Sequence, residues 1–333
     1  MSAAIEHVGV VGGGAWGTAL AEVARRAGRR VLLWARDGAV ADEINQQHTN
    51  TAYLPGITLD AGLAATSALA RMAEVDVVLL ATPAQTQRSV ALALAPHLAP
   101  ETPVVICSKG LEHSTGKLMT DVLTETLPDC RMAVLSGPGF AEDVVRGLPT
   151  ALTLACRDEG LGKALVGAIG CRHFRLYWTS DTTGVAFGGA MKNVLAIAAG
   201  IVDGRGLGAS AHAALVTRGF AEMRRLGAAF GANPDTLVGL SGLGDLLLTC
   251  GSPQSRNMRL GRLLGQGRSL SEGLAMLHST AEGVYTAAAA VRSADAYGVE
   301  VPIAAAVHAI IEGQITIDDA IEGLLSRPFR SEM

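Results

Sequence analysis

The sequence predicts an α/β doubly wound sheet followed by an all-α C-terminal domain. In the first half of the chain, short runs rich in Val, Leu and Ile alternate with helix-like segments. Such continuous apolar runs are typical of strands buried on both faces of a parallel sheet. Beyond about Thr179 the strand-like runs end, and Ala, Leu and Met recur at helical spacing. We therefore expect two domains, over residues 1–178 and 179–333.

The strand-like runs come in a regular order along the first half. They cover residues 8–11, 31–34, 75–82, 104–108, 133–136, 151–155 and 174–177. Because helical segments separate these runs, they predict βαβ units of a doubly wound sheet. The last runs are candidates for antiparallel pairing at one edge.

The second half is predicted to be helical throughout. It begins with a long helix through Ala199, for which Asp181 is a suitable N-cap. Further helices are predicted over residues 209–229, 253–264, 270–277, 283–297 and 303–312. Ligands of doubly wound sheets bind at the carboxyl ends of the parallel strands, and we expect those ends to face these helices.

Three glycines mark the first junction between a strand and a helix. Gly12, Gly14 and Gly17 have the G-x-G-x-x-G spacing, follow the run 8–11 and open a helical segment over residues 18–27. The first permits the tight turn, the second lets the backbone approach a pyrophosphate, and the third lets the helix pack on the sheet. The N–H groups of the first helical turn then face the phosphates. This context favours a Rossmann-type dinucleotide-binding domain over an ordinary βα turn.

Composition argues against several other classes of protein. The net charge of −4 and an isoelectric point near 6.1 argue against a nucleic-acid partner. The apolar runs fall short of the ~20 residues of a membrane span, and no secretory signal is visible. The scattered cysteines, Cys107, Cys130, Cys156, Cys171 and Cys250, are expected to be reduced core thiols of a cytoplasmic protein. The histidines have no metal-binding spacing, so no metal is expected.

The residues after the second predicted strand bear on which dinucleotide is bound. Proteins that select NAD usually carry Asp or Glu there, to bind the ribose 2′-hydroxyl. Here Arg36 stands nineteen positions after Gly17, and a guanidinium suits the 2′-phosphate of NADPH. The alternative is that Arg36 is solvated and Asp37 takes the hydroxyl of NADH. We predict NADPH as the preferred cofactor, with NADH as the alternative.

Two polar islands follow strands of the predicted sheet. Lys109 comes directly after the run 104–108, which aims it at the ligand crevice, although a solvated loop lysine is the alternative. A glycine-rich turn with Gly137 and Gly139 follows the next strand. Its backbone amides either contact substrate or only shape the turn.

A third island lies inside the long predicted helix. Lys192 has apolar neighbours and follows Gly188 and Gly189, which cost helix stability and so need a reason, such as close approach to the other domain. Burial or a neighbouring cation would lower the pKa of Lys192, as proton transfer near neutrality requires. A lysine that snorkels to the surface is the alternative.

A fourth island runs from Asp245 to Asn257. Asp245 is placed either to orient a catalytic lysine or to cap a turn. Ser252 followed by Pro253 is a helix-start signature, which puts Ser255, Arg256 and Asn257 in or near a first helical turn. A basic side chain beside unpaired amides suits a phosphate, and an exposed arginine is the alternative.

Together these islands resemble the bacterial NAD(P)-dependent glycerol-3-phosphate dehydrogenases over nearly the whole chain. The strongest match is GAMKNVLA at residues 189–196, with Gly200, Asp203-Gly204 and residues 206–208 following in the family's order and spacing. GGAWGTAL at residues 13–20, SKGLE at 108–112, QSRN at 254–257 and EG at 282–283 also match.

The resemblance implies reversible hydride transfer between NAD(P)H and C2 of dihydroxyacetone phosphate, giving sn-glycerol 3-phosphate for phospholipid synthesis. It makes Lys192 the general acid, and the base in reverse, while Lys109 polarises the carbonyl or holds substrate. Asp245 would order the lysines, and Arg256 and Asn257 would hold the phosphate. The implied cofactor-binding residues are Gly12, Gly14, Ala15, Trp16, Gly17, Arg36, Lys109, Ala141, Arg256 and Glu282. The implied substrate-binding residues are Lys109, Gly137, Gly139, Lys192, Asp245, Ser255, Arg256 and Asn257.

Two positions depart from the family pattern, which usually has Ser or Thr at Gly139 and Asn at Ser210. Neither departure removes a charged group, so we expect altered contacts rather than lost activity. The family also implies a homodimer. Two alternative functions stay open: a related two-domain hydroxy-acid dehydrogenase, and a non-catalytic dinucleotide sensor, which would leave Lys192 unexplained.

Overall fold

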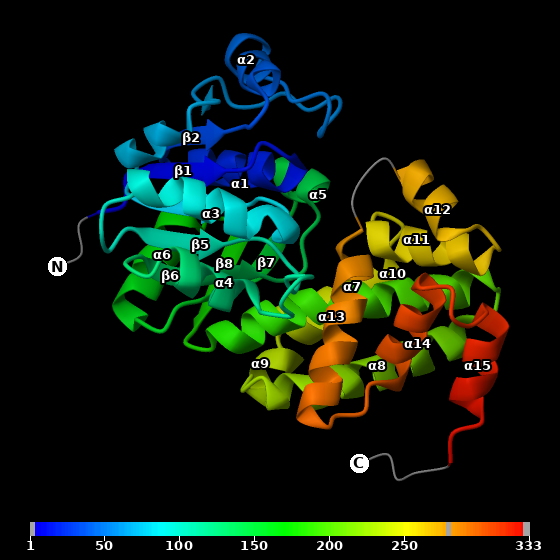
Figure 1. Cartoon of the computed structure of the whole chain (residues 1–333). Helices are drawn as coiled ribbons and strands as arrows, with labels where there is room; N and C mark the ends of the chain where they lie inside the picture. Colours follow the sequence, from blue (N-terminus) through cyan, green and yellow to red (C-terminus); the bar gives the residue numbers. More distant parts are fainter. Residues whose placement is uncertain (1–3, 278–280, 329–333) are drawn as a thin grey trace.

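The computed structural model describes residues 4–277 and 281–328 and confirms the predicted fold class. Within these residues, one eight-stranded sheet is followed by a group of helices (Figure 1). The strands are β1 (His7–Val11), β2 (Arg30–Trp34), β3 (Ala64–Thr66), β4 (Val77–Leu80), β5 (Pro103–Ile106), β6 (Arg131–Ser136), β7 (Thr150–Ala155) and β8 (Phe174–Thr179). Their order across the sheet is β3-β2-β1-β4-β5-β6-β7-β8.

Most of the sheet is parallel. β1 lies between β2 and β4, so that Val10 pairs with Leu33 on one side and with Leu79 on the other. β7 pairs antiparallel with β6 and parallel with β8, which confirms the antiparallel pairing expected at one edge. Because the strand order reverses at β1 and β4, the ligand crevice of such a sheet opens at their carboxyl ends.

One strand, β3, was not predicted from the sequence. β3 has three residues, Ala64–Thr66, and so lacks the apolar run that marks the other strands. It pairs along β2, where Leu32 faces Ala64 and Trp34 faces Thr66. The run 75–82 was also predicted too long, since β4 covers only Val77–Leu80 before the chain turns at Pro83.

Helices cover both faces of the sheet. They are α1 (Ala15–Arg26), α2 (Gly38–Gln47), α3 (Gln87–Leu94), α4 (Met119–Thr126), α5 (Ala141–Val145) and α6 (Glu159–Ile169). Val77 and Leu79 of β4 pack in the core with α1, α5 and α6, whereas Val78 and Leu80 pack in the core with α3 and α4. This alternation is the two-sided burial that the continuous apolar runs predicted.

Within the described residues, the helical half contains nine α-helices, α7 to α15. The helices are α7 (Thr182–Gly204), α8 (Ala209–Ala229), α9 (Pro234–Val238), α10 (Asp245–Gly251), α11 (Arg256–Gly265), α12 (Leu270–Leu277), α13 (Glu282–Tyr297), α14 (Pro302–Ile311) and α15 (Ile317–Leu325). The predictions over 209–229 and 270–277 are confirmed at both ends. Asp181 does cap α7, by accepting a hydrogen bond from the Gly184 N–H at 2.8 Å.

The predicted helix start at Ser252 and Pro253 is wrong. α11 begins at Arg256, and Ser255 is its N-cap, because the Ser255 hydroxyl accepts a hydrogen bond from the Met258 N–H at 3.2 Å. α10, which ends at Gly251, and a π-helical turn over Leu240–Gly244 lie in a stretch for which the sequence predicts no helix. The glycines of the π-helical turn, Gly242 and Gly244, argue against a helix there, since glycine is unfavourable in helix interiors.

α7 is the central helix of the second half (Figure 1). It packs against α8, α10, α11, α13 and α14, and also against β6. Contrary to our expectation for apolar runs, α7 is long and apolar enough to cross a membrane by length and composition. Its most apolar window is 94 % buried inside the protein, as in a core helix.

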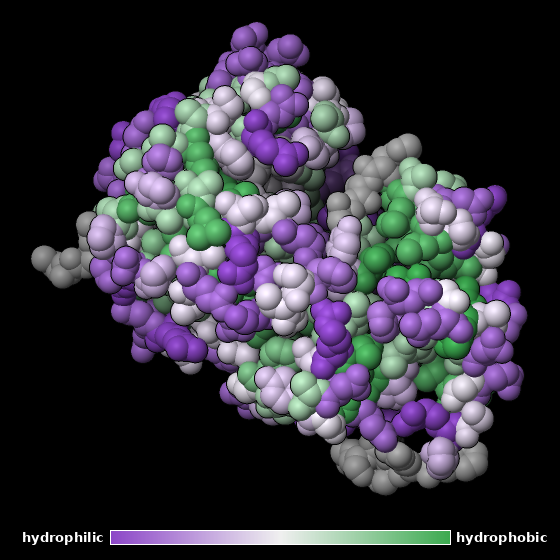
Figure 2. Space-filling model, viewed as in Figure 1, coloured by the Kyte–Doolittle hydropathy of each residue, from purple (hydrophilic) through white to green (hydrophobic). Residues whose placement is uncertain are grey.

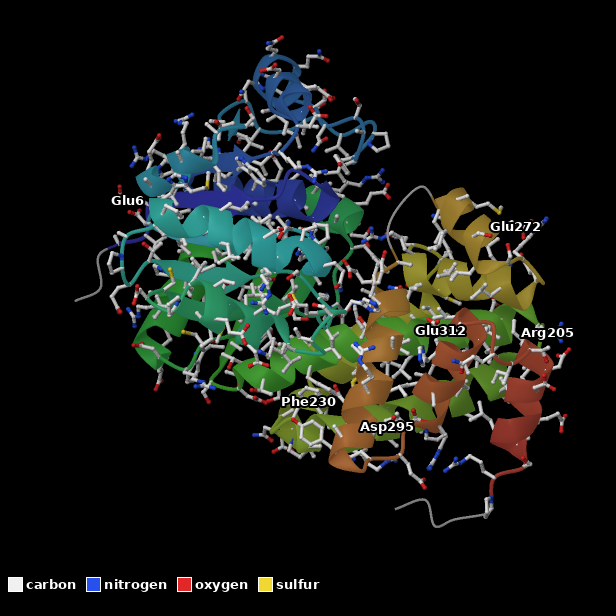
Figure 3. All side chains as sticks on the ribbon, viewed as in Figure 1. Glu6, Arg205, Phe230, Glu272, Asp295 and Glu312 are labelled. Atoms are coloured by element: carbon white, nitrogen blue, oxygen red, sulfur yellow. The ribbon has the colours of Figure 1, made fainter. Side chains whose placement is uncertain are left out.

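Aromatic contacts fix the start of α7 against neighbouring helices. Phe230, labelled in Figure 3, follows α8 at the lower end of the helical half. Its ring lies 5.0 Å from that of Phe187 and 5.3 Å from that of Tyr297, measured between centroids.

In the view of Figure 2, apolar surface is concentrated over the helical half, which has exposed apolar side chains such as Met276 and Leu325.

All five cysteines are free thiols. Cys107, Cys156 and Cys250 are buried, as expected for core residues, whereas Cys130 and Cys171 are only half-buried, so the core assignment was too broad for these two. Within residues 4–277 and 281–328, no group of three or more His, Cys, Asp or Glu side chains is placed to hold a metal ion.

Candidate active site

One buried carboxylate joins two lysines between the sheet and the helices. Lys109 follows β5, and its Nζ donates to Asp245 Oδ2 at 2.6 Å and to the Gly137 carbonyl at 2.9 Å. Lys192, on α7, donates from Nζ to Asp245 Oδ1 at 2.5 Å and to Thr249 Oγ1 at 3.0 Å. The structure thus brings Lys109, Gly137, Lys192 and Asp245 together from four separate segments.

Lys192 is set apart by its burial. Only 7 % of the residue is exposed, and burial lowers its pKa to about 7. Asp245 opposes this shift and Lys109 adds to it, because opposite charge favours the ammonium and like charge disfavours it. A lysine with such a pKa gives up and regains a proton near neutrality, as general acid–base chemistry requires. The alternative of a snorkelling surface lysine does not fit this burial.

Asp245 stands at the first position of α10, directly after the π-helical turn. A carboxylate is favoured at a helix N-terminus by the helix dipole. Thr249 lies one turn further along α10, where its hydroxyl reaches Lys192. We did not predict Thr249 as a site residue; its i+4 spacing from Asp245 was the available signal once α10 was recognised.

The start of α11 forms another wall of the site. Arg256 is exposed at the first helical position, beside the Ser255 cap. Asn257 is buried, and its side-chain amide donates to Asn193 Oδ1 and accepts from the Gly283 N–H, each at 3.0 Å. Asn257 therefore ties α11 to α7 and to the start of α13. Asn193, which we had not included among the site residues, takes part in the same contact.

The glycine turn after β1 has the geometry that a dinucleotide needs. Gly12 has φ +128°, and a Cβ there would lie 2.9 Å from the Ala81 backbone, while a Cβ at Gly17 would overlap the Gly12 carbonyl. At Gly14 no atom lies within 4 Å of such a Cβ, which leaves open space for an approaching group. Gly14 gives α1 no side-chain cap, so the N–H groups of the first turn, which begins at Ala15, stay available to phosphates.

Other cofactor candidates lie around this turn. Trp16, in the first turn of α1, has a buried indole N–H without a hydrogen-bond partner among the described residues. A Cβ at Gly139 would lie 3.5 Å from the Trp16 ring, so the turn after β6 reaches α1. Ala141 begins α5 two residues later. The buried Trp16 N–H, which has no partner among the described residues, and the open space beside Gly14 both fit a bound dinucleotide.

Arg36 and Asp37 differ in that only Asp37 caps a helix. Asp37 is the N-cap of α2 and accepts a hydrogen bond from the Ala39 N–H at 2.9 Å. Arg36 is exposed beside it. Both residues are exposed near the end of β2, and the cap occupies one of the two Asp37 carboxylate oxygens.

Glu282 begins α13 and faces the sheet. Its carboxylate lies 3.5 Å from Gln85 Nε2, and burial raises its pKa, opposed by Gln85, the Ala84 backbone and Arg256. Gln85 also donates to the Leu111 carbonyl at 2.9 Å, which joins the segment after β4 to the loop that carries Lys109. Gln85 had no sequence signal, because its role depends on contacts made only in the fold.

Ser210, one of the two departures from the family pattern, lies exposed in the first turn of α8. It takes no part in the hydrogen bonds between the lysines and Asp245.

Models of one protein family match both halves of the chain. The N-terminal model of NAD-dependent glycerol-3-phosphate dehydrogenase matches residues 7–161, and its C-terminal model matches residues 181–322. A glycerol-3-phosphate dehydrogenase [NAD(P)+] of Parvibaculum lavamentivorans is 55 % identical over 332 residues and covers all of both chains. The chain belongs to the NAD-dependent glycerol-3-phosphate dehydrogenase family. This confirms the resemblance that the motifs indicated.

Solved structures of this family have the same fold. The glycerol-3-phosphate dehydrogenase of Coxiella burnetii superposes with a TM-score of 0.92 at 37 % identity, over 97 % of this chain and 99 % of that one. The yeast glycerol-3-phosphate dehydrogenase superposes with a TM-score of 0.83 at 27 % identity, over 96 % and 99 % of the two chains. Membership of the family favours a dehydrogenase over a non-catalytic sensor.

Proposed function

We propose that the chain catalyses the NAD(P)-dependent interconversion of dihydroxyacetone phosphate and sn-glycerol 3-phosphate. The observation that carries this proposal is the cluster of Lys192, Asp245 and Lys109 at the carboxyl end of a dinucleotide-binding sheet. Family membership supports the same reaction. We assign the dinucleotide to residues 1–178 and the proton donor to residues 179–333.

Proton transfer is the part of the reaction that these residues carry out. Bound NAD(P)H supplies the hydride for the carbonyl carbon C2. Lys192 donates a proton from Nζ to the carbonyl oxygen as negative charge develops there, which completes the alcohol. In the reverse direction neutral Lys192 accepts the hydroxyl proton. With a pKa of about 7, this lysine is available in both forms near neutral pH.

Lys109 and Asp245 serve this transfer. The Lys109 ammonium stabilises the developing oxyanion as a charge already held in place, which costs no reorganisation during the reaction. Asp245 holds the two ammonium groups on one carboxylate and keeps Lys192 protonated against the effect of burial.

The substrate phosphate is assigned to the start of α11. Arg256 supplies an exposed guanidinium. The Ser255 hydroxyl caps the Met258 N–H, so we assign the N–H groups of Arg256 and Asn257, at the first two helical positions, to the phosphate. The side chain of Asn257 is engaged with Asn193 and Gly283, so we assign its contribution to the backbone N–H. Ser255 keeps its capping role, and Gly139 offers only backbone.

The direct test of the function is a cofactor-oxidation assay. The purified chain is mixed with dihydroxyacetone phosphate and either NADPH or NADH, and cofactor absorbance is followed. We expect turnover with the phosphorylated substrate and none with a 2-keto acid of similar length. Turnover with the keto acid alone would support a hydroxy-acid dehydrogenase, and cofactor binding without turnover would support a sensor.

We also propose that NADPH is preferred, because Arg36 is exposed and Asp37 caps a helix. Arg36→Asp should lower the ratio of kcat/KM for NADPH to that for NADH by about tenfold or more, as expected for loss of a charged contact. Arg30→Asp, an exposed arginine at the start of β2, is the matched control and should leave the ratio unchanged. An unchanged ratio in Arg36→Asp would contradict the assignment.

A cytoplasmic location and a homodimer remain further parts of the proposal. The exposed apolar surface of the helical half is a candidate for the subunit contact. Sedimentation of the purified chain at micromolar concentration tests the oligomeric state, and a monomer would contradict the dimer.

A further inference from the structure

Two adjacent glycines interrupt the interior of α7 just before Lys192. Gly188 and Gly189 are both buried. A glycine in a helix interior costs about 1 kcal/mol relative to alanine, so a pair of them in the central helix needs a structural reason. We expected close approach to the other domain, but only one of the two glycines makes that contact.

Gly188 lies against the π-helical turn of its own half. A Cβ at Gly188 would stand 2.7 Å from the Ser241 carbonyl oxygen and 3.0 Å from Gly242 Cα. These are backbone atoms of the turn Leu240–Gly244, which leads directly into Asp245. A side chain at this position must therefore push the turn, and with it Asp245, away from α7.

Gly189 lies against the sheet half. A Cβ at Gly189 would stand 2.6 Å from Ser136 Oγ and 3.3 Å from Lys109 Cγ. Ser136, at the end of β6, is 2 % exposed, and its hydroxyl has no hydrogen-bond partner among the described residues. The glycine thus sets how closely the stem of Lys109 approaches α7.

Both glycines share a face of α7 with Lys192. Gly188 precedes it by four residues and Gly189 by three, the two spacings that bring helical residues onto one face. Helical side chains also lean toward the N-terminus and cover the preceding turn. The side chain of Lys192 therefore extends over the surface that the two glycines leave flat.

We propose that Gly188 and Gly189 are positioning residues that set the distances from Lys192 to Asp245 and to Lys109. Gly188 acts through the backbone of the π-helical turn, and Gly189 acts through the stem of Lys109. The contact at Gly188 is the stiffer one, because backbone atoms cannot rotate away as the Ser136 hydroxyl can. This inference rests on the proposed role of Lys192 in proton transfer.

The two glycines should have opposite effects on the charge of Lys192. Asp245 raises the pKa of Lys192 and Lys109 lowers it, whereas the Cys250 thiol nearby on α10, its pKa raised to about 12 by burial, stays neutral. Displacing Asp245 in Gly188→Ala should therefore lower the pKa of Lys192. Displacing Lys109 in Gly189→Ala should raise it.

The experiment compares Gly188→Ala and Gly189→Ala with Gly204→Ala. Gly204 lies near the end of the same helix, and a Cβ there would overlap the Arg262 backbone, so this variant is a matched control for crowding of α7. The titration of Lys192 is followed by NMR in the full-length chain with labelled lysine, assigned by comparison with Lys192→Ala. Thermal unfolding, kcat and KM are measured on the same samples.

We expect opposite shifts of the Lys192 pKa in the two variants and none in Gly204→Ala. The kcat of Gly188→Ala should fall by about 10- to 100-fold, as expected when a catalytic group is misplaced by up to about 1 Å. Gly189→Ala should lose less. Ser136→Ala removes the oxygen nearest to the new methyl group but leaves Lys109 Cγ beside it, so the raised pKa of Lys192 should persist when Ser136→Ala is added to Gly189→Ala.

Unchanged titration of Lys192 in both variants, with stability lowered as in Gly204→Ala, would overturn the inference and leave the glycines as packing residues only. Shifts of the same sign would also overturn it. Wild-type chain without turnover would instead overturn the proposed function, while the NMR titration still tests the positioning role. If Gly188→Ala does not fold, Gly189→Ala with and without Ser136→Ala decides the outcome.

Discussion

Asp245 and Glu222 are two buried carboxylates of the helical half that differ in their partners. Asp245 is fully buried, and its oxygens lie 2.6 Å from Lys109 Nζ and 2.5 Å from Lys192 Nζ. Glu222, on α8, is 2 % exposed and accepts hydrogen bonds from the Ile303 and Ala304 N–H groups at the start of α14, at 2.8 and 3.2 Å.

Under the proposed function, this difference separates a structural acid, Glu222, from one that we assign to the chemistry, Asp245. The N-terminus of α14 offers Glu222 two N–H donors and a partial positive charge, which fastens α8 to α14. Burial nevertheless raises the pKa of Glu222 to about 7. Asp245 instead accepts hydrogen bonds from the Nζ groups of Lys109 and Lys192. Burial is therefore common to both carboxylates, and it is their partners that differ.

Of the changes to the two clusters, removing Lys192 should lower catalysis the most. We expect Lys192→Ala to lower kcat for dihydroxyacetone phosphate by about 10²- to 10⁴-fold, the usual contribution of a general acid. Binding of NADPH should change little. Lys163→Ala, an exposed lysine paired with Glu159 on α6, is the control. A near-normal rate in Lys192→Ala would show that another group donates the proton.

Neutralising Asp245 should have the next largest effect. Asp245→Asn removes the charge that favours protonated Lys192, so the pKa of Lys192 should fall below its value of about 7 and its acid form should become scarce at pH 7. We expect kcat for reduction to fall by about 10²-fold at pH 7 and to recover partly at lower pH. Asp203→Asn, in an exposed ion pair with Arg262, is the control. Equal losses at every pH would argue against this role.

Arg256→Ala tests whether the phosphate contact is separate from the proton transfer. Loss of a charged hydrogen bond costs about 1.5–3 kcal/mol, which corresponds to a rise of about 10- to 150-fold in KM for dihydroxyacetone phosphate. The kcat should fall less than the KM rises, since the lysines keep their positions. Arg259→Ala, an exposed arginine further along α11, serves as the matched variant. A loss confined to kcat would move Arg256 out of the binding role.

Glu222→Gln should have the smallest effect, because only stability changes. The folded chain holds the Glu222 proton more tightly than the unfolded chain, so its free energy of unfolding falls as the pH rises from about 4.5 to about 7. Glutamine does not ionise, and the variant should lose this decrease, by up to about 3 kcal/mol. Urea unfolding at pH 5 and pH 8 measures it. A parallel pH dependence in both proteins would contradict the expectation, as would a changed kcat.

The sequence predicted the parts of the site that local patterns determine. The turn at Gly12 to Gly17 and Lys109 were found because each follows an apolar strand, and strand ends meet at one edge of a sheet. Lys192 was predicted because its apolar neighbours and the two preceding glycines favour burial over free solvation, with a lysine that snorkels to the surface as the alternative. Asp245 was predicted as a site residue, but the sequence around it did not predict the helix α10.

The contacts that join separate elements could not be predicted in the same way. Thr249 and Gln85 carry no motif of their own, and their partners are 57 and 26 residues away in the chain. The π-helical turn before Asp245 was hidden by its glycines, of which Gly242 leaves room for the Leu237 backbone, where a Cβ would overlap the carbonyl oxygen. Such residues become visible only when distances are known.

The pH dependence of kcat/KM in both directions tests most directly whether Lys192 is the shared acid and base. We expect reduction to slow as the pH rises through about 7 and oxidation of sn-glycerol 3-phosphate to accelerate through the same pKa. The substrate phosphate, with its second pKa near 6, titrates with the same sign in both directions and cannot produce such a mirror image. Profiles that change in the same direction, or not at all between about pH 6 and 9, would contradict the role of Lys192.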